Sequence, residues 1–234
     1  MLKERDGRIL KLIVERYLSS GEPISSSDLV ESFSLKVSTA TVRNIMAKLC
    51  QLGYLDQPHT SAGRVPQVAA YRYYVSYFLA GSRVSKALLD EIKRQKQELV
   101  DYYELTRFIL AKLANATSNV ALARLPGHVM ISGWANFFAC SDFGTIDHLA
   151  RLVRLLEDKQ RTENLLTSLG QPEGVRFLIG EESVCNELKD CTLAITSYPT
   201  RYGQGTLGLM GPVRMNYRKA LGFLEKCAEA LAQE

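Results

Sequence analysis

The sequence predicts an α+β protein that begins with a winged helix-turn-helix, continues through a long helical segment and ends in an α+β domain. Three observations predict this class. Over the first fifty residues, apolar side chains recur at helical spacing in three segments that Gly, Pro and Ser separate. A short stretch after them reads as strand, small polar loop and strand. Farther along, helical and strand-like segments are mixed up to a C-terminal helix, as in α+β domains.

The first three predicted helices form the helix-turn-helix. The first runs from Lys3 to Ser20 and ends at Gly21 and Pro23, the second has N-caps in Ser25–Ser27, and Ser38 or Thr39 caps the third. Gly53 ends the third helix. The expected inward faces are Leu10, Ile13, Val14, Tyr17 and Leu18 in the first helix, Leu29, Val30 and Phe33 in the second, and Val42, Ile45, Met46, Leu49 and Leu52 in the third.

The outward face of the third helix has residue types that read base edges in DNA. Arginine binds guanine through two hydrogen bonds, asparagine or glutamine binds adenine in the same way, and the methyl groups of alanine and threonine contact thymine. A helix face that is merely solvated would also be polar, so the pattern leaves both interpretations open. The outward residues are Thr41, Arg43, Asn44, Ala47, Lys48 and Gln51.

A predicted β-wing follows the third helix and favours the DNA-binding interpretation. Tyr54–Gln57 reads as a strand, and Pro58–Pro66 reads as a small polar loop followed by a second strand, with a loop that presents hydrogen-bond donors and one arginine. A helix in the major groove with a wing against the flanking backbone or minor groove is a working DNA-binding geometry. The expected DNA-binding residues are Ser38, Thr39, Thr41, Arg43, Asn44, Lys48, His59, Thr60, Ser61 and Arg64.

We expect two roles among these residues. Arg43, Asn44 and their neighbours would specify the base sequence. The residues that would mainly hold the DNA backbone are Lys48, His59, Thr60, Ser61 and Arg64.

The charge of the chain is concentrated in the same segment. The 234 residues carry a net charge of +4. Residues 1–83 hold 11 Lys and Arg against 7 Asp and Glu, so the whole excess is N-terminal. Residues 35–83 carry six basic residues and one acid, Asp56. This concentration favours a surface that faces a polyanion, although a solvated face is the alternative interpretation.

Composition excludes several other classes. Apolar residues make up 46 % of the chain and charged residues 23 %, which is typical of a soluble globular protein of one or two domains. Residues 1–8 are too charged for a secretion signal, and no apolar run is long enough to cross a bilayer, so we expect a cytoplasmic protein. The 5 cysteines form no CxxC pair, and we expect neither a disulfide framework nor a structural zinc site.

Several blocks of sequence resemble the bacterial heat-inducible transcription repressor family HrcA. The blocks are Gly21-Glu22-Pro23, Ser38 to Asn44 with Met46, Gln57 to Pro66, Tyr71 to Val75 and, near the C-terminus, Leu207 to Tyr217. The wing block is long and specific, and both ends of the chain match. The resemblance therefore covers more than a borrowed DNA-binding module.

The resemblance implies a function, partners and a fold for the second half. It implies a dimer that binds double-stranded DNA at the inverted repeat called CIRCE, upstream of chaperone operons, and blocks transcription. It implies that the GroE-type chaperonin keeps the repressor active and that heat diverts the chaperonin to unfolded clients. It also implies a GAF-like regulatory domain. The residues themselves show no metal-ligand spacing and no catalytic constellation, so we expect no cofactor, no metal and no enzymatic activity.

Some positions depart from the family pattern. Ser25-Ser26-Ser27 replaces a Gly-Ser-Arg stretch, Ile45 replaces an acid, and Gln67-Val68-Ala69-Ala70 replaces Thr-Asp-Lys-Gly. Operator preference is therefore expected to differ in detail. Between Pro126 and His128 the family has further strands and an inserted subdomain that this chain lacks, which predicts a shortened regulatory domain.

We expect three regions: a winged helix-turn-helix over 1–80, a linker and dimerisation helix over 81–125, and the shortened GAF-like domain over 126–234. Ser85 to Ala116 contains no Pro or Gly and carries two seven-residue tracks, which suits a helix pairing with its copy. Packing on its own domain is the alternative. The later elements are expected at Val129–Trp134 (strand), Thr145–Leu169 (helix with Ile146, Leu149, Val153 and Leu156 inward), Val175–Ile179, Thr192–Ser197 and Thr206–Met210 (strands), and Asn216–Ala232 (helix).

Two further hypotheses stay open. Gly203 to Gly208 matches the GxGxxG pattern of dinucleotide sites, but Pro199 and Pro212 flank it and a strand-like stretch follows, so a hairpin turn is favoured. The alternative hypothesis for function is that the α+β domain binds a small-molecule ligand that sets DNA affinity, and it rests on fold analogy.

Overall fold

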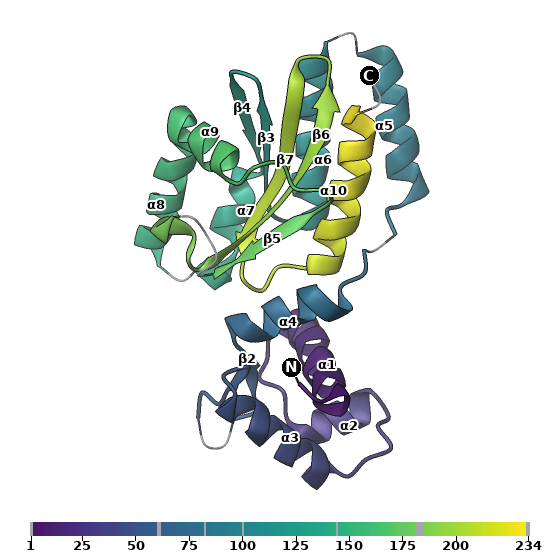
Figure 1. Cartoon of the computed structure of the whole chain (residues 1–234), viewed down its shortest axis with the longest axis vertical. Helices are drawn as coiled ribbons and strands as arrows, with labels where there is room; N and C mark the ends of the chain where they lie inside the picture. Colours follow the sequence, from purple (N-terminus) through teal and green to yellow (C-terminus); the bar gives the residue numbers. More distant parts are fainter. Residues whose placement is uncertain are drawn as a thin grey trace. The chain divides into compact units, whose positions relative to one another are not determined.

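A computed structural model describes residues 2–59, 62–81, 83–99, 101–143, 145–180 and 185–232. The chain divides into two compact units, Met1–Leu79 and Ala80–Glu234 (Figure 1). We refer to them as unit 1 and unit 2. None of the helices in the described residues is long and apolar enough to cross a membrane.

Unit 1 is a small helical unit with a two-stranded antiparallel sheet. Leu55 pairs with Pro66 and Asp56 with Val65, so each strand is shorter than the expected segment around it. α1 contacts α2, α3 and α4. In chain order the elements are α1 (Glu4–Ser20), α2 (Ser26–Ser32), α3 (Thr39–Gln51), β1 (Leu55–Asp56), β2 (Val65–Pro66) and α4 (Val68–Phe78).

The predicted stop and start signals of unit 1 are confirmed. Gly21 adopts φ +73° and its N–H donates to the Tyr17 carbonyl, so it closes α1. The Ser25 hydroxyl accepts from the Asp28 N–H at the start of α2, and the Ser38 hydroxyl accepts from the Thr41 N–H at the start of α3.

The predicted core of unit 1 is confirmed with corrections at the helix ends. The buried apolar residues of the first three helices include Leu10, Ile13, Val14, Leu29, Val42, Ile45, Met46 and Leu49. Leu52 was expected on the inward face, but its side chain is 51 % exposed because α3 ends at Gln51 and Leu52 no longer follows the helical spacing. Tyr17, Leu18, Val30 and Phe33 are only half-buried.

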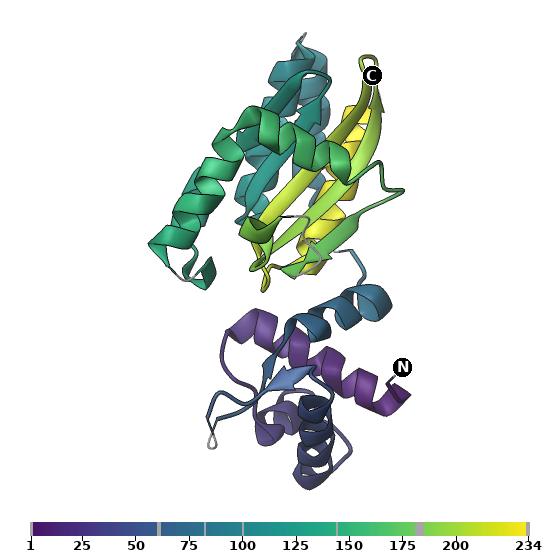
Figure 2. The ribbon, with the colours of Figure 1, turned by 60° about the vertical axis from the view of Figure 1, so that its left-hand side comes forward.

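Unit 2 is built on an antiparallel sheet with the strand order β4-β3-β7-β6-β5. α6 and α10 cover one face, and α7, α8 and α9 lie on the other, where the apolar core cluster packs (Figures 1 and 2). The strands are β3 (Val120–Leu125), β4 (His128–Ser132), β5 (Arg176–Ile179), β6 (Cys191–Thr200) and β7 (Gly203–Pro212). The α-helices are α5 (Lys86–Glu98), α6 (Tyr102–Thr117), α7 (Trp134–Ala139), α8 (Ile146–Glu157), α9 (Lys159–Ser168) and α10 (Tyr217–Ala232).

The single long helix expected over Ser85–Ala116 is wrong. The chain forms α5 and α6 instead, with the Asp101 side chain capping α6 by accepting from the Tyr103 N–H. The two helices contact each other, and Lys112 Nζ lies 2.7 Å from Glu91 Oε1. α6 packs on β3, β4 and α10, so its apolar side chains pack within its own unit. Packing on its own unit, the alternative weighed for this segment, is thus shown for α6, and pairing of two copies through the segment stays a prediction.

The predicted helix over Thr145–Leu169 is also two helices. Asp158 ends α8 and caps α9 through its side chain, which accepts from the Arg161 N–H. Ile146, expected inward, is 84 % exposed because it is the first residue of α8 and precedes the stripe that faces the sheet. The side chains of α8 that enter the apolar cluster are Leu152, Leu155 and Leu156.

Two tight turns of unit 2 lie at segments that the sequence analysis singled out. Gly203–Gly208 lies at the start of β7 in an antiparallel hairpin with β6, so the hairpin interpretation of the GxGxxG pattern is confirmed. Pro126 and Gly127 join β3 to β4, with Leu125 paired to His128. β3 was not expected as a strand, and it places residues 120–125 in the same sheet as the segments that follow.

Candidate nucleic-acid interface

The exposed face of α3 presents most of the side chains that the sequence selects for DNA. Arg43, Asn44 and Lys48 are exposed, Thr41 is half-buried, and the opposite face is held in the core. The side chains of Arg43 and Asn44 have no hydrogen-bonding partner within the described part of the chain. Both polar groups are therefore available to a ligand.

The start of α3 is fixed by its own hydroxyl groups. The Thr41 N–H donates to Ser38 Oγ at 3.1 Å, and the two hydroxyl oxygens of Ser38 and Thr41 lie 2.9 Å apart. Thr39 is exposed beside them. Ser38 thus acts first as the N-cap that orients α3.

The wing is joined to the loop before α2 at one point. Two backbone hydrogen bonds link Ile24 and Arg64, from Ile24 N to Arg64 O at 2.9 Å and from Arg64 N to Ile24 O at 2.8 Å. A Cβ added to Gly63 would lie 2.5 Å from the carbonyl carbon and oxygen of Ile24, closer than side-chain atoms approach backbone. Glycine is therefore required at residue 63 for this contact.

The loop of the wing has its own support. Gln57 Nε2 donates to the Ala62 carbonyl at 3.2 Å, and the Ala62 N–H donates to the His59 carbonyl at 2.9 Å. His59 is exposed. Thr60 and Ser61, expected to contact DNA, lie outside the described residues. The loop and α3 lie at the same end of unit 1 in both views (Figures 1 and 2).

Lys48 has a partner inside unit 1. Its Nζ forms an ion pair with Asp6 Oδ2, and the Asp6 side chain is only 9 % exposed whereas that of Lys48 is 45 % exposed. The pair joins the end of α3 to the start of α1. A phosphate contact by Lys48 would have to compete with this buried carboxylate.

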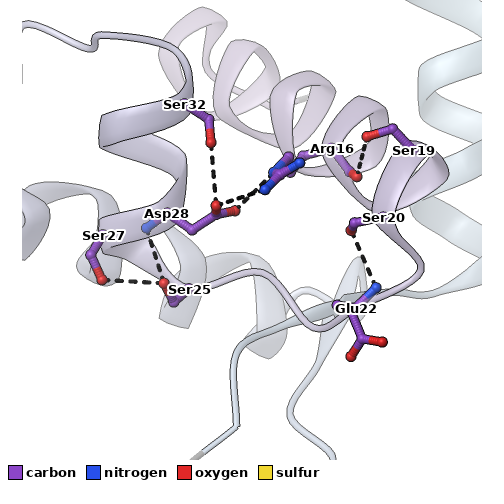
Figure 3. Close-up of polar contacts among 8 residues, drawn as sticks. All are labelled: Arg16, Ser19, Ser20, Glu22, Ser25, Ser27, Asp28 and Ser32. Carbon is purple, nitrogen blue, oxygen red and sulfur yellow. Dashed lines mark hydrogen bonds and ion pairs between the residues drawn. The ribbon is translucent and has the colours of Figure 1, made fainter.

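A second ion pair fixes α2 against α1. Arg16 donates from Nε to Asp28 Oδ2 at 3.1 Å and from its NH2 nitrogen to Oδ1 at 3.0 Å, and Ser32 Oγ also donates to Asp28 (Figure 3). The hydrogen bond from Arg16 lowers the pKa of Asp28 from its ordinary value. Asp28 is thereby turned toward α1.

A hollow opens between the start of α2, the exposed face of α3 and the wing. Its volume is about 460 Å³. Arg43 and Arg64 both border it, so the structure brings two of the predicted residues together, one from each element. The described lining residues are Ile24, Ser25, Ser26, Ser27, Arg43, Met46, Gln57, Ala62, Gly63 and Arg64.

Sequence reasoning missed three residues of this region. Asp6 falls four residues before Leu10 and seven before Ile13, so it lies on the apolar stripe of α1. A charged residue on such a stripe signals a partner, although it does not identify Lys48. Ser26 and Gln57 gave no comparable signal, because their roles depend on the distance between α2 and the wing.

No cluster of three or more His, Cys, Asp or Glu that could hold a metal occurs in the described residues. Burial raises the pKa of the Cys191 thiol, and raises that of Cys227 to about 12. Both thiols therefore stay protonated near neutral pH.

The two units together define a class. The chain is an α+β protein in which a helical unit with an exposed helix face and a two-stranded sheet is joined to an antiparallel sheet domain. A family model described as "HrcA protein C terminal domain" matches residues 61–221. This match spans more than half of the chain, and the chain belongs to the HrcA family.

Curated relatives agree along the whole chain. A protein of Carboxydothermus hydrogenoformans, named heat-inducible transcription repressor HrcA, is 25 % identical over an alignment of 337 positions that covers 100 % of this chain and 98 % of the relative. Relatives with the same name from Pelotomaculum thermopropionicum and Laribacter hongkongensis are 24 % and 25 % identical and cover 96 % and 95 % of their own length. The 337 positions exceed the 234 residues of this chain, so the relative carries residues that this chain lacks.

One solved structure shares the fold. The crystal structure of a hypothetical protein superposes with a TM-score of 0.78 at 19 % identity, and the match covers 99 % of this chain and 97 % of that one. This similarity supports the α+β fold of this chain.

Proposed function

We propose that this protein is a transcriptional repressor that binds double-stranded DNA in a sequence-specific manner. Support comes from the name shared by its curated relatives and from the exposed face of α3, whose Arg43 and Asn44 have no partner within the described residues. The observation that carries the proposal is the meeting of α3 and the wing at one hollow bordered by Arg43 and Arg64.

In this proposal unit 1 is a winged helix-turn-helix. α2 and α3 are the helix-turn-helix, α3 enters the major groove, and the loop between β1 and β2 is the wing against the flanking backbone. Asn44 and Thr41 face base edges, while His59, Thr60, Ser61 and Arg64 contact the backbone. The ion pair with Asp6 makes Lys48 a lesser contributor than the sequence predicts.

The regulatory part of the proposal concerns unit 2. We propose that it is a shortened GAF-like domain, which the two-residue turn at Pro126–Gly127 and the greater length of the aligned relative support. The partners are a second copy of the chain, an inverted-repeat operator of the CIRCE type near chaperone operons, and the GroE-type chaperonin. Control by a chaperonin requires only that the regulatory half be marginally stable.

Binding to DNA tests the proposal. The full chain is used to select duplexes from a random-sequence pool, and the affinity for the selected duplex is measured at several salt concentrations. We expect an inverted repeat to be selected and the logarithm of the affinity to fall linearly with the logarithm of the salt concentration, by about 0.9 per phosphate contacted. Failure to select any duplex, or an affinity independent of salt, would contradict it.

Repression and chaperonin control have their own test. Transcription in vitro from a promoter that overlaps the selected site should fall when the protein is added. After heating, GroE-type chaperonin should restore both binding and repression. If the heated and unheated proteins bind equally with and without chaperonin, the chaperonin is not a partner.

A further inference from the structure

Two side chains that line the hollow between α2, α3 and the wing, Ser26 and Arg64, have polar groups without a hydrogen-bonding partner among the described residues. Ser26 lies at the start of α2 with 8 % of its surface exposed, and its hydroxyl has no hydrogen-bonding partner among the described residues. Its neighbours differ, because the hydroxyls of Ser25 and Ser27 lie 3.2 Å apart and Ser25 also caps α2 (Figure 3).

Arg64 is also incompletely satisfied. Its Nε is buried without a hydrogen-bonding partner, although its NH1 nitrogen donates to the Ala62 carbonyl at 3.4 Å. A buried donor without an acceptor carries a free-energy cost. An acceptor placed in the hollow would remove this cost by accepting a hydrogen bond from Arg64 Nε. The same acceptor would also receive a hydrogen bond from the Ser26 hydroxyl.

The charge of the hollow selects an anion. Arg43 and Arg64 border it, and none of its described lining residues is acidic. The carboxylate nearest in sequence to the three serines, Asp28, is held by Arg16 and Ser32. Two guanidinium groups and a hydroxyl are the donors that bind a phosphate group.

We propose that the hollow holds one backbone phosphate of the bound duplex through Arg43, Arg64 and Ser26. The inference rests on the proposed function and changes the role that the sequence predicts for Arg43. Arg43 acts with the wing on the backbone and carries little base specificity, which remains with Asn44. One phosphate therefore joins α3 and the wing to the same point of the DNA.

The test neutralises one phosphate of the selected duplex at a time by methylphosphonate substitution. With the wild-type full chain, one position in each half-site should lose affinity about tenfold, as expected for a charge-assisted hydrogen-bonded contact. With Ser26→Ala or Arg43→Gln, the same substitution should cost less than about twofold, because the contact is already weakened. Lys36→Gln, which removes an exposed charge of unit 1 outside the hollow, should retain the tenfold loss at that position.

The outcomes separate this inference from the proposed function. If no duplex is selected, the proposed function fails. If a duplex is bound and the sensitive phosphates are the same in the wild type, Ser26→Ala and Arg43→Gln, only the phosphate site is wrong. Titration with inorganic phosphate distinguishes the source of the phosphate group. Saturable binding that Ser26→Ala abolishes, with an unchanged methylphosphonate profile, would assign the hollow to free phosphate and overturn the DNA contact.

Discussion

Gly63 lies directly against the backbone of Ile24, at a distance that leaves no room for a Cβ. The contact joins the wing to the loop that precedes α2, beside the two backbone hydrogen bonds between Ile24 and Arg64. The close approach of the wing to the loop before α2 therefore requires a glycine at residue 63.

Gly63→Ala should separate the wing from α2. The added methyl group meets backbone atoms that cannot rotate away, so we expect a loss of about 1–3 kcal/mol in the free energy of unfolding of unit 1. DNA affinity should fall as well, because Arg64 moves with the wing. Denaturant unfolding and DNA titration measure the two effects, with Ala69→Ser, at a half-buried residue of α4 outside the hollow, as the control. A variant as stable as the wild type would show that the contact is looser than described.

Lys48→Met should destabilise unit 1 without changing the number of DNA phosphates contacted. The substitution leaves the carboxylate of Asp6 buried without its partner, and we expect a loss of about 1–2 kcal/mol because Lys48 is partly exposed. Asp6→Asn in the same chain should recover part of it. If Lys48→Met instead lowers the salt dependence of binding by about 0.9, Lys48 contacts a phosphate as the sequence predicts.

The Arg16–Asp28 pair predicts a specific pH dependence of stability. The pKa of Asp28 is lowered in the folded state, mainly by the hydrogen bond from Arg16, so the pair stabilises the fold at pH values above the ordinary pKa of aspartate, about 3.9. This contribution is lost as the pH falls through the lowered pKa. The stability difference between the wild type and Asp28→Asn should be largest near neutral pH and should shrink below about pH 4. A constant difference across that range would contradict the assignment.

Leu110→Ala should destabilise unit 2 without specifically weakening association between copies. Leu110 is 1 % exposed and lies on α6, which packs on the sheet and α10 of its own unit. We expect a loss of about 2–5 kcal/mol in the free energy of unfolding. Sedimentation at a temperature where the variant is folded should show an unchanged oligomeric state. Dissociation of a folded variant would restore the idea of an intermolecular seam at this segment.

Local sequence signals predicted the helix ends of unit 1 well. Features that depend on contacts between distant residues were not predicted. Gly21, Ser25 and Ser38 act as the stop and caps that their residue types indicate, because capping is decided within one helical turn. The seven-residue repeats of Ser85–Ala116 could not distinguish two packed helices from one long helix, because an apolar stripe has the same spacing in both. The break falls at Asp101, a capping residue inside a stretch without Gly or Pro.

The candidate site was predicted in type but not in arrangement. The polar face of α3 and the arginine of the wing follow from the sequence pattern. The hollow they share with Ser26, and the ion pair that engages Lys48, depend on how α1, α2 and the wing pack. Such contacts join residues far apart in the chain, which periodicity does not encode.

Discrimination between DNA sequences by Asn44→Ala tests the central claim most directly. The affinities of the wild type and the variant are compared for the selected duplex, for single base-pair changes in it and for a shuffled duplex at one salt concentration. We predict that the variant loses discrimination at one base pair in each half-site by about tenfold and binds the shuffled duplex within about twofold of the wild type. A variant that discriminates at every base pair as the wild type does would contradict the claim that the exposed face of α3 reads DNA.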